Sequence, residues 1–291
     1  MNKESGVQAS VSDSPAKIRA SVNYLSADSH INRRFVAPGA EINTGRYLPH
    51  EVDIHNARIG DAPTLDTHGF TLARHRSAID DFHDREAIDR LYPDEVLETV
   101  KAMTGADLVV PLGWMLRTSG DTSAGQMQPP AGEVHVDMLP QRADRLADML
   151  AEKAGLKPGG YRRFIASSLW RPISTPPHDW SLAVCDFRSV DPDEGVANVM
   201  VNVEKLPEGD DVFAELPGED RLPAASVFRF NPAHRWYYYP DMTRDEVLMF
   251  KFYDSDHSVA WRAPHTAFED PHPPRPNMRE SIEFRTVAYF L

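Results

Sequence analysis

The stretch SLAVCDF at residues 181–187 belongs to a series of short segments, rich in β-branched and aromatic residues, that determines the fold class. Before it stand DLVVPL (107–112), GEVHVDM (132–138) and RRFIASSLWRPI (162–173), and after it ANVMVNV (197–203), SVFRFN (226–231), RWYYYP (235–240), VLMFKFYD (247–254) and RESIEFRTVAYF (279–290). The connections, marked by Pro, Asp and Gly, are too short for helices between parallel strands. The pattern predicts a mainly β protein with flanking helices, a double-stranded β-helix of the jelly-roll, cupin-like type.

Two helices and one domain complete the expected organisation. Apolar residues recur with helical spacing from Asp94 to Thr104 and from Gln141 to Ala154, and a glycine follows each segment. Residues 1–20 are polar, rich in serine and without periodicity, which predicts a disordered tail. We expect residues 21–291 to form a single oxygenase domain of the double-stranded β-helix type, and the oligomeric state stays open, with a homo-oligomer among the options.

Composition excludes several classes of function. The net charge of −13 and the lack of a basic run argue against nucleic acid and against an anionic membrane surface. No apolar stretch reaches the ~20 residues of a membrane helix, and no signal peptide is apparent. Cys185 is the only cysteine, so neither an intrachain disulfide nor a cysteine zinc site is possible, and we expect a cytoplasmic protein acting on a small molecule.

A candidate metal-binding pair lies in the segment GEVHVDM. His135 and Asp137 are two residues apart, so on a strand both side chains point to one face. Two histidines and one carboxylate form the facial triad of non-haem Fe(II) oxygenases, which leaves positions for other ligands. Alone the pair is a weak signal, because a polar surface strand would have the same residues.

A second histidine has to come from later in the chain. His265 stands in WRAPHTAFEDP, just before the last strand, and is the preferred third ligand. His257 competes with it, but two aspartates and a turn-like segment surround it. His234 precedes an aromatic run that we interpret first as core.

The final strand offers a site for an anion. In Fe(II) oxygenases that use the cosubstrate 2-oxoglutarate, one end of this molecule chelates the iron and the other end is a free carboxylate. That carboxylate needs an arginine fork, usually with a hydroxyl beside it. Alternation places Arg279 and Ser281 on one face, opposite Ile282 and Phe284. Arg285 lies on the same face as Arg279 and is the alternative anchor.

The order of these motifs resembles the hydroxylase/desaturase group of fungal and bacterial natural-product oxygenases, which includes the cephamycin-type cephem hydroxylase component. The resemblance runs from about Leu65 to the C-terminus and is carried by LDTHGFTLARHRSAIDDF (65–82), TGADLVV (104–110), HVD (135–137), LWRPI (169–173), SLAVCDFRSV (181–190), HRWYYYPDM (234–242), EVLMFKFYDSD (246–256), PHTAFEDP (264–271) and RESIEFR (279–285).

The resemblance implies Fe(II), 2-oxoglutarate and dioxygen. It assigns the metal to His135, Asp137 and His265, and the distal carboxylate of 2-oxoglutarate to Arg279. It also implies that Arg171, Arg117 and Trp170 lie in the substrate or cosubstrate pocket. A buried structural ion pair is an equally good interpretation of Arg171.

The expected activity is therefore oxidation of a C–H bond of a small molecule by an iron- and 2-oxoglutarate-dependent dioxygenase, giving hydroxylation, desaturation or cyclisation. One alternative is an iron oxygenase or isomerase of the same fold that does not use 2-oxoglutarate. Another is a β-sandwich that binds small molecules without catalysis. Zinc hydrolysis would fit the triad but would leave the arginine and serine of the last strand unexplained.

Overall fold

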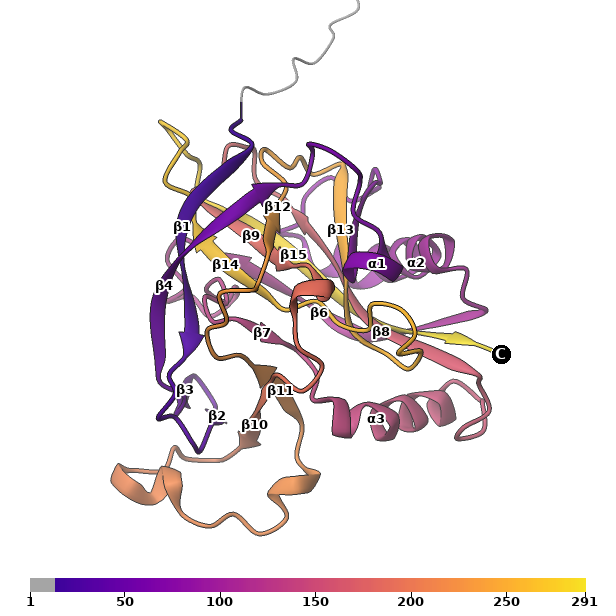
Figure 1. The fold of residues 1–291 in the computed structure, drawn as a ribbon. Coiled ribbons are helices and arrows are strands. Elements are labelled where there is room, and N and C mark those ends of the chain that lie inside the picture. Colours follow the sequence, from indigo (N-terminus) through magenta and orange to yellow (C-terminus); the bar gives the residue numbers. More distant parts are fainter. Residues whose placement is uncertain (1–13) are drawn as a thin grey trace, which may run out of the picture.

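The computed structural model describes residues 14–291 and consists mainly of two β-sheets that face each other (Figure 1). The larger sheet has the strand order β1 (Lys17–Leu25), β4 (Tyr47–Asn56), β12 (Trp236–Tyr238), β9 (Trp180–Cys185), β14 (His265–Glu269), β7 (His135–Val136), β11 (Ala224–Val227), β10 (Val196–Asn202), β2 (Arg33–Ala37) and β3 (Ala40–Asn43). The smaller sheet has the order β5 (Phe70–Arg74), β13 (Glu246–Asp254), β8 (Arg163–Pro172), β15 (Glu280–Phe290) and β6 (Leu108–Thr118). The predicted mainly β class is confirmed.

The helices lie outside these sheets. Within residues 14–291 they are α1 (Leu65–His68), α2 (Arg85–Thr104) and α3 (Pro140–Lys153), with the short 3-10 helices η1 (Phe187–Ser189), η2 (Gly209–Phe213) and η3 (Glu219–Arg221). Helix α3 matches the expected segment closely. Helix α2 begins well before the expected Asp94, because the side chain of Asp84 caps its N-terminus by accepting a hydrogen bond from the backbone of Ala87.

The N-terminal part of the chain differs most from the expectation. Residues 1–13 of the predicted disordered tail lie outside the described residues. Residues 17–20 are ordered within β1, so the expected boundary at residue 21 comes too late. Ile18 and Ala20 are buried while Lys17 and Arg19 are exposed, the alternation of a half-buried strand that pairs antiparallel with β4. Strands β1 to β5 were not predicted, because their apolar residues stand among polar ones and form no continuous apolar run.

Along β15, apolar side chains that point away from the other sheet alternate with polar side chains that point between the sheets. Ile282 and Phe284 point outward and pack with Tyr92 and other residues of α2. Ser281 and Glu283 point inward, between the sheets, and both are buried. The predicted face assignment of this strand is confirmed.

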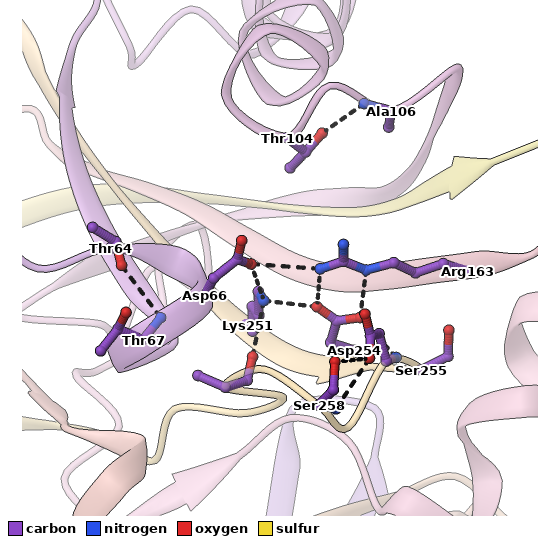
Figure 2. Close-up of polar contacts among 12 residues, drawn as sticks. Thr64, Asp66, Thr67, Thr104, Ala106, Arg163, Lys251, Asp254, Ser255 and Ser258 are labelled. Carbon is purple, nitrogen blue, oxygen red and sulfur yellow. Dashed lines mark hydrogen bonds and ion pairs between the residues drawn. The ribbon is translucent and has the colours of Figure 1, made fainter.

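A buried charged network ties α1 to the ends of β8 and β13 (Figure 2). Lys251 has no exposed surface and donates to Asp254 at 2.7 Å, to the backbone oxygen of Ala260 at 2.8 Å and to Asp66 at 3.3 Å. Arg163 holds the same carboxylate of Asp254 with two hydrogen bonds, of 2.9 and 2.6 Å. All three protons of Lys251 thus have acceptors, so we interpret this network as structural.

Across residues 14–291, none of the helices combines the length and the apolar composition that crossing a membrane requires.

Candidate metal centre

Three side chains from two neighbouring strands meet between the sheets. His135 lies on β7 and His265 opens β14, and these two residues are direct partners in the antiparallel register. Asp137 follows β7 immediately. One ligand atom from each residue lies within 4.8 Å of the others, and both histidines are buried. The structure therefore brings the predicted triad together at one point.

The two imidazoles are oriented through their second nitrogens. Nδ1 of His135 is 2.8 Å from the backbone oxygen of Glu133, and Nδ1 of His265 is 3.1 Å from that of Ala263. Because a carbonyl oxygen only accepts, each Nδ1 carries the proton and donates it. Each Nε2 is left with its lone pair toward Asp137, at 3.9 Å from Oδ1 for His135 and 3.5 Å from Oδ2 for His265.

The protonation states also suit metal binding. Burial, followed by the neighbouring His265, lowers the pKa of His135. Burial opposes ionisation of Asp137, but Arg285 and the two histidines hold the pKa of its carboxyl well below its usual value. A neutral imidazole and an ionised carboxylate are the forms that ligate a metal. This donor set fits Fe(II).

A narrow cavity connects the two histidines to the start of β15. Its lining includes His135, His265, Trp170, Leu182 and Arg279. It measures about 20 Å³, which is room for about one water molecule. A larger molecule would enter only if some of these side chains moved.

Arg279 and Ser281 bring unsatisfied polar atoms to this region. Nε and Nη1 of Arg279 and the hydroxyl of Ser281 are buried and have no hydrogen-bond partner among the described residues. Burial, followed by repulsion from Arg117, lowers the pKa of Arg279 to about 9. A buried cation and a hydroxyl without hydrogen-bond partners are suited to an anion.

Arg285, the alternative anchor, is engaged elsewhere. It donates to Oδ1 of Asp137 at 2.9 Å and to Glu283 at 2.7 Å. It therefore has no free fork of the kind that Arg279 offers. These contacts favour Arg279 over Arg285 as the anion site.

A wider cavity of about 550 Å³ also reaches the triad, and its volume is within the usual range for small-molecule sites. His135 and Asp137 line its inner end, and Met115, Met138 and Leu146 are among its apolar lining residues. Helix α3 and the segment around η3 contribute further residues to its walls.

The remaining predicted pocket residues are divided between the two faces of the smaller sheet. Arg117 lines both cavities, and Trp170 lines the narrow one. Arg171 lines neither, because it follows Trp170 on β8 and so points to the opposite face. There it donates to the hydroxyl of Tyr92 and to the backbone oxygen of Arg244, and it contacts His75. The structure does not bring Arg171 to the site.

The competing histidines lie elsewhere. His257 is exposed and stacks on Trp261 at 4.7 Å between ring centroids. His234 is held between the hydroxyl of Tyr24 and the carboxylate of Glu194. Neither belongs to the group around Asp137.

Sequence reasoning missed Glu283, which contacts both Arg285 and Arg117 behind the triad. The alternation of RESIEFR held a signal, since Glu283 shares its face with Arg279, Ser281 and Arg285.

Comparison with known proteins agrees with this geometry. Residues 22–289 match the family model described as oxidoreductase/YMDC permease-like domain. The chain is 30% identical to the hydroxylase/desaturase efuI of Hormonema carpetanum, covering 84% of this chain and 85% of that protein. It is 31% identical to the Fe(II)/2-oxoglutarate-dependent dioxygenase nvfI of Aspergillus novofumigatus, covering 87% of each. Among solved structures, it is similar to the iron and alpha-ketoglutarate-dependent endoperoxidase NvfI, with a TM-score of 0.79 and 28% identity over 94% of this chain and 98% of that one. This similarity confirms the predicted jelly-roll oxygenase fold.

Proposed function

This chain belongs to the hydroxylase/desaturase family of Fe(II)/2-oxoglutarate-dependent dioxygenases, and on that basis we propose which of its residues perform the reaction. The enzyme oxidises a small molecule of a natural-product pathway with iron, 2-oxoglutarate and dioxygen. His135, Asp137 and His265 hold the iron. Arg279 and Ser281 bind the distal carboxylate of 2-oxoglutarate. The wider cavity receives the substrate.

One observation carries the assignment of the cosubstrate site. The unpaired guanidinium of Arg279 lines the same narrow cavity as the two histidines, and the unpaired hydroxyl of Ser281 lies on the same face of β15. A dianion with a metal-chelating end and a free carboxylate needs this combination.

The residues around the site divide the remaining tasks. When bound, the iron supplies the oxidising chemistry, in which conversion of 2-oxoglutarate to succinate and carbon dioxide is coupled to removal of hydrogen from a substrate C–H bond. The triad presents three ligand atoms from one side, so other positions stay open. Trp170, Leu182 and Phe250 line the cosubstrate cavity and exclude water from it. The apolar lining of the wider cavity orients the substrate toward Asp137 and His135.

Anaerobic reconstitution with Fe(II), followed by addition of 2-oxoglutarate, tests the proposal. A visible charge-transfer band should form in the wild type and be lost in Arg279→Ala. Arg19→Ala, which removes an exposed arginine of β1, is the matched control and should keep the band. If well-folded protein with bound iron gave no band, the proposed function would be wrong. If Arg279→Ala kept the band, the assignment of Arg279 would be wrong.

A further inference from the structure

A network of ion pairs with alternating charge extends from Asp137 through Arg285 and Glu283 to Arg117. Arg285 reaches Asp137 with Nη2 at 2.9 Å and Glu283 with Nε at 2.7 Å. The other oxygen of Glu283 lies 3.7 Å from Nε of Arg117, whose Nη1 donates to the backbone oxygen of Pro129 at 2.9 Å. Glu283 and Arg285 come from the inner face of β15, and Arg117 comes from the neighbouring β6. The network of ion pairs is therefore anchored in the smaller sheet.

This network of ion pairs is shielded from water. The side chain of Glu283 is 7% exposed, that of Asp137 is 15% exposed and that of Arg285 is 25% exposed. Hydrogen bonds between ionised groups in such surroundings are short and about twice as strong as neutral ones. The network of ion pairs can therefore hold the side chain of Asp137 in one orientation.

Asp137 needs such a restraint. Strand β7 ends at Val136, and backbone pairing with β11 is next made by Leu139, whose N–H donates to the backbone oxygen of Ala224, so Asp137 lies between two points of attachment. The contact with Arg285 occupies Oδ1. Oδ2 is buried without a hydrogen-bond partner among the described residues and lies 3.5 Å from Nε2 of His265. The two oxygens of this carboxylate thus differ in what they can still bind.

We propose that Arg285 and Glu283 are positioning residues that turn the Asp137 carboxylate so that Oδ2 alone is offered to the metal. Arg285 holds Oδ1, and Glu283 holds Arg285. The inference rests on the proposed function, because it assumes that Asp137 ligates the iron. It gives Arg285 a task different from that of Arg279.

The ion pair with Glu283 also explains why the positive charge of Arg285 is tolerated so close to a metal ion. Arg285 alone would repel a divalent ion through its charge. Glu283, at 2.7 Å, offsets that charge, so the pair supplies a hydrogen bond to Asp137 without adding net charge. A variant that removes both members therefore changes the orientation of Asp137 and leaves the net charge of the site the same.

The charge-balanced double variant Arg285→Gln/Glu283→Gln tests this inference. Its matched control is Lys205→Gln/Glu208→Gln, which removes an exposed pair of the same two charges, joined at 2.8 Å and more than 75% exposed. Arg285→Lys is a third variant that keeps the charge but loses the planar fork. Binding of Co(II) alone is measured by calorimetry, and its visible bands report the coordination of the ion.

We expect the dissociation constant for Co(II) to rise about 10- to 100-fold in the double variant, the usual effect of losing a partner of a metal ligand. The bands should change as well, because both oxygens of Asp137 become free to bind. Arg285→Lys should show a smaller rise, and it remains the test if the double variant fails to fold. The control should match the wild type.

The outcomes separate the inference from the proposed function. If the double variant, or Arg285→Lys in its place, binds Co(II) with wild-type affinity and wild-type bands, the positioning role is refuted while the metal site stands. If the wild type binds no Co(II), or if His265→Ala binds it equally well, the metal site itself is refuted.

Discussion

Replacing Arg279 with methionine should make the cosubstrate-free protein more stable while abolishing binding of 2-oxoglutarate. Arg279 is 1% exposed, and burial lowers the pKa of its guanidinium from 12.5 to about 9. At 1.36 kcal/mol for each pKa unit, holding this charge costs about 5 kcal/mol of folding free energy. Part of that cost is offset by the ring of Trp170, 5.8 Å away. Apolar replacement of buried charges stabilises by about 1–4 kcal/mol, and we expect a gain in that range.

The gain should depend on pH with a definite sign. Below pH 9 the guanidinium of Arg279 is protonated in both the folded and the unfolded chain, so the full cost is present. Above that pH the unfolded chain retains the proton while the folded chain loses it, and the wild type gains stability relative to Arg279→Met. The difference between the two proteins should therefore be constant from pH 7 to about 8 and shrink as the pH rises through about 9.

Urea unfolding of both proteins, with and without 2-oxoglutarate and Mn(II), provides the assay. Ligand at 100 times its dissociation constant should stabilise the wild type by about 2.7 kcal/mol more than Mn(II) alone. Arg279→Met should show no such increment. The reasoning is refuted if Arg279→Met is less stable than the wild type without ligand, or if it retains the increment.

Three further predictions concern the metal, the core and the cavity wall. His265→Ala should weaken Mn(II) binding at least ~100-fold by calorimetry whereas His257→Ala should not, and equal effects would contradict the choice of His265. Lys251→Met should lower the free energy of unfolding by about 1–3 kcal/mol in urea, because it removes the charge-assisted hydrogen bond to the buried carboxylate of Asp254 and leaves Arg163 as its only cation, and an unchanged stability would refute this. Arg33→Met should speed amide exchange in residues 209–222 alone, since Arg33 donates to Glu219 and to two backbone oxygens there; a uniform increase would argue instead for global destabilisation.

Residue spacing alone was sufficient to predict which side chains share one face of a strand. The period of two puts Ser281 of β15, and Arg279 just before it, on the inner face, opposite Ile282 and Phe284, because side chains alternate in any extended segment. The same rule made His135 and Asp137 a candidate ligand pair. Strand β1 follows the same rule, with Ile18, Ala20, Val22 and Tyr24 buried, but it was not predicted because residues 1–20 were assigned to a polar tail.

The choice between equivalent residues required the tertiary structure. Arg279 and Arg285 share a strand face, and only the position of Asp137 shows that Arg285 is engaged while Arg279 is free. Likewise, Arg171 is next to Trp170 in sequence, but packing of α2 on the smaller sheet takes its guanidinium to Tyr92.

The sequence by itself determined which residue types alternate along each strand, and hence the mainly β class, the candidate ligand pair His135 and Asp137, and the candidate anion-binding segment that begins at Arg279. Those are local properties, set by backbone geometry over a few residues. Only the folded chain decided that His135 pairs with His265 across 130 positions, that Arg279 stays unpaired, and that Arg285 lies between Asp137 and Glu283. Such contacts depend on strand order and register between distant segments, which no local pattern encodes.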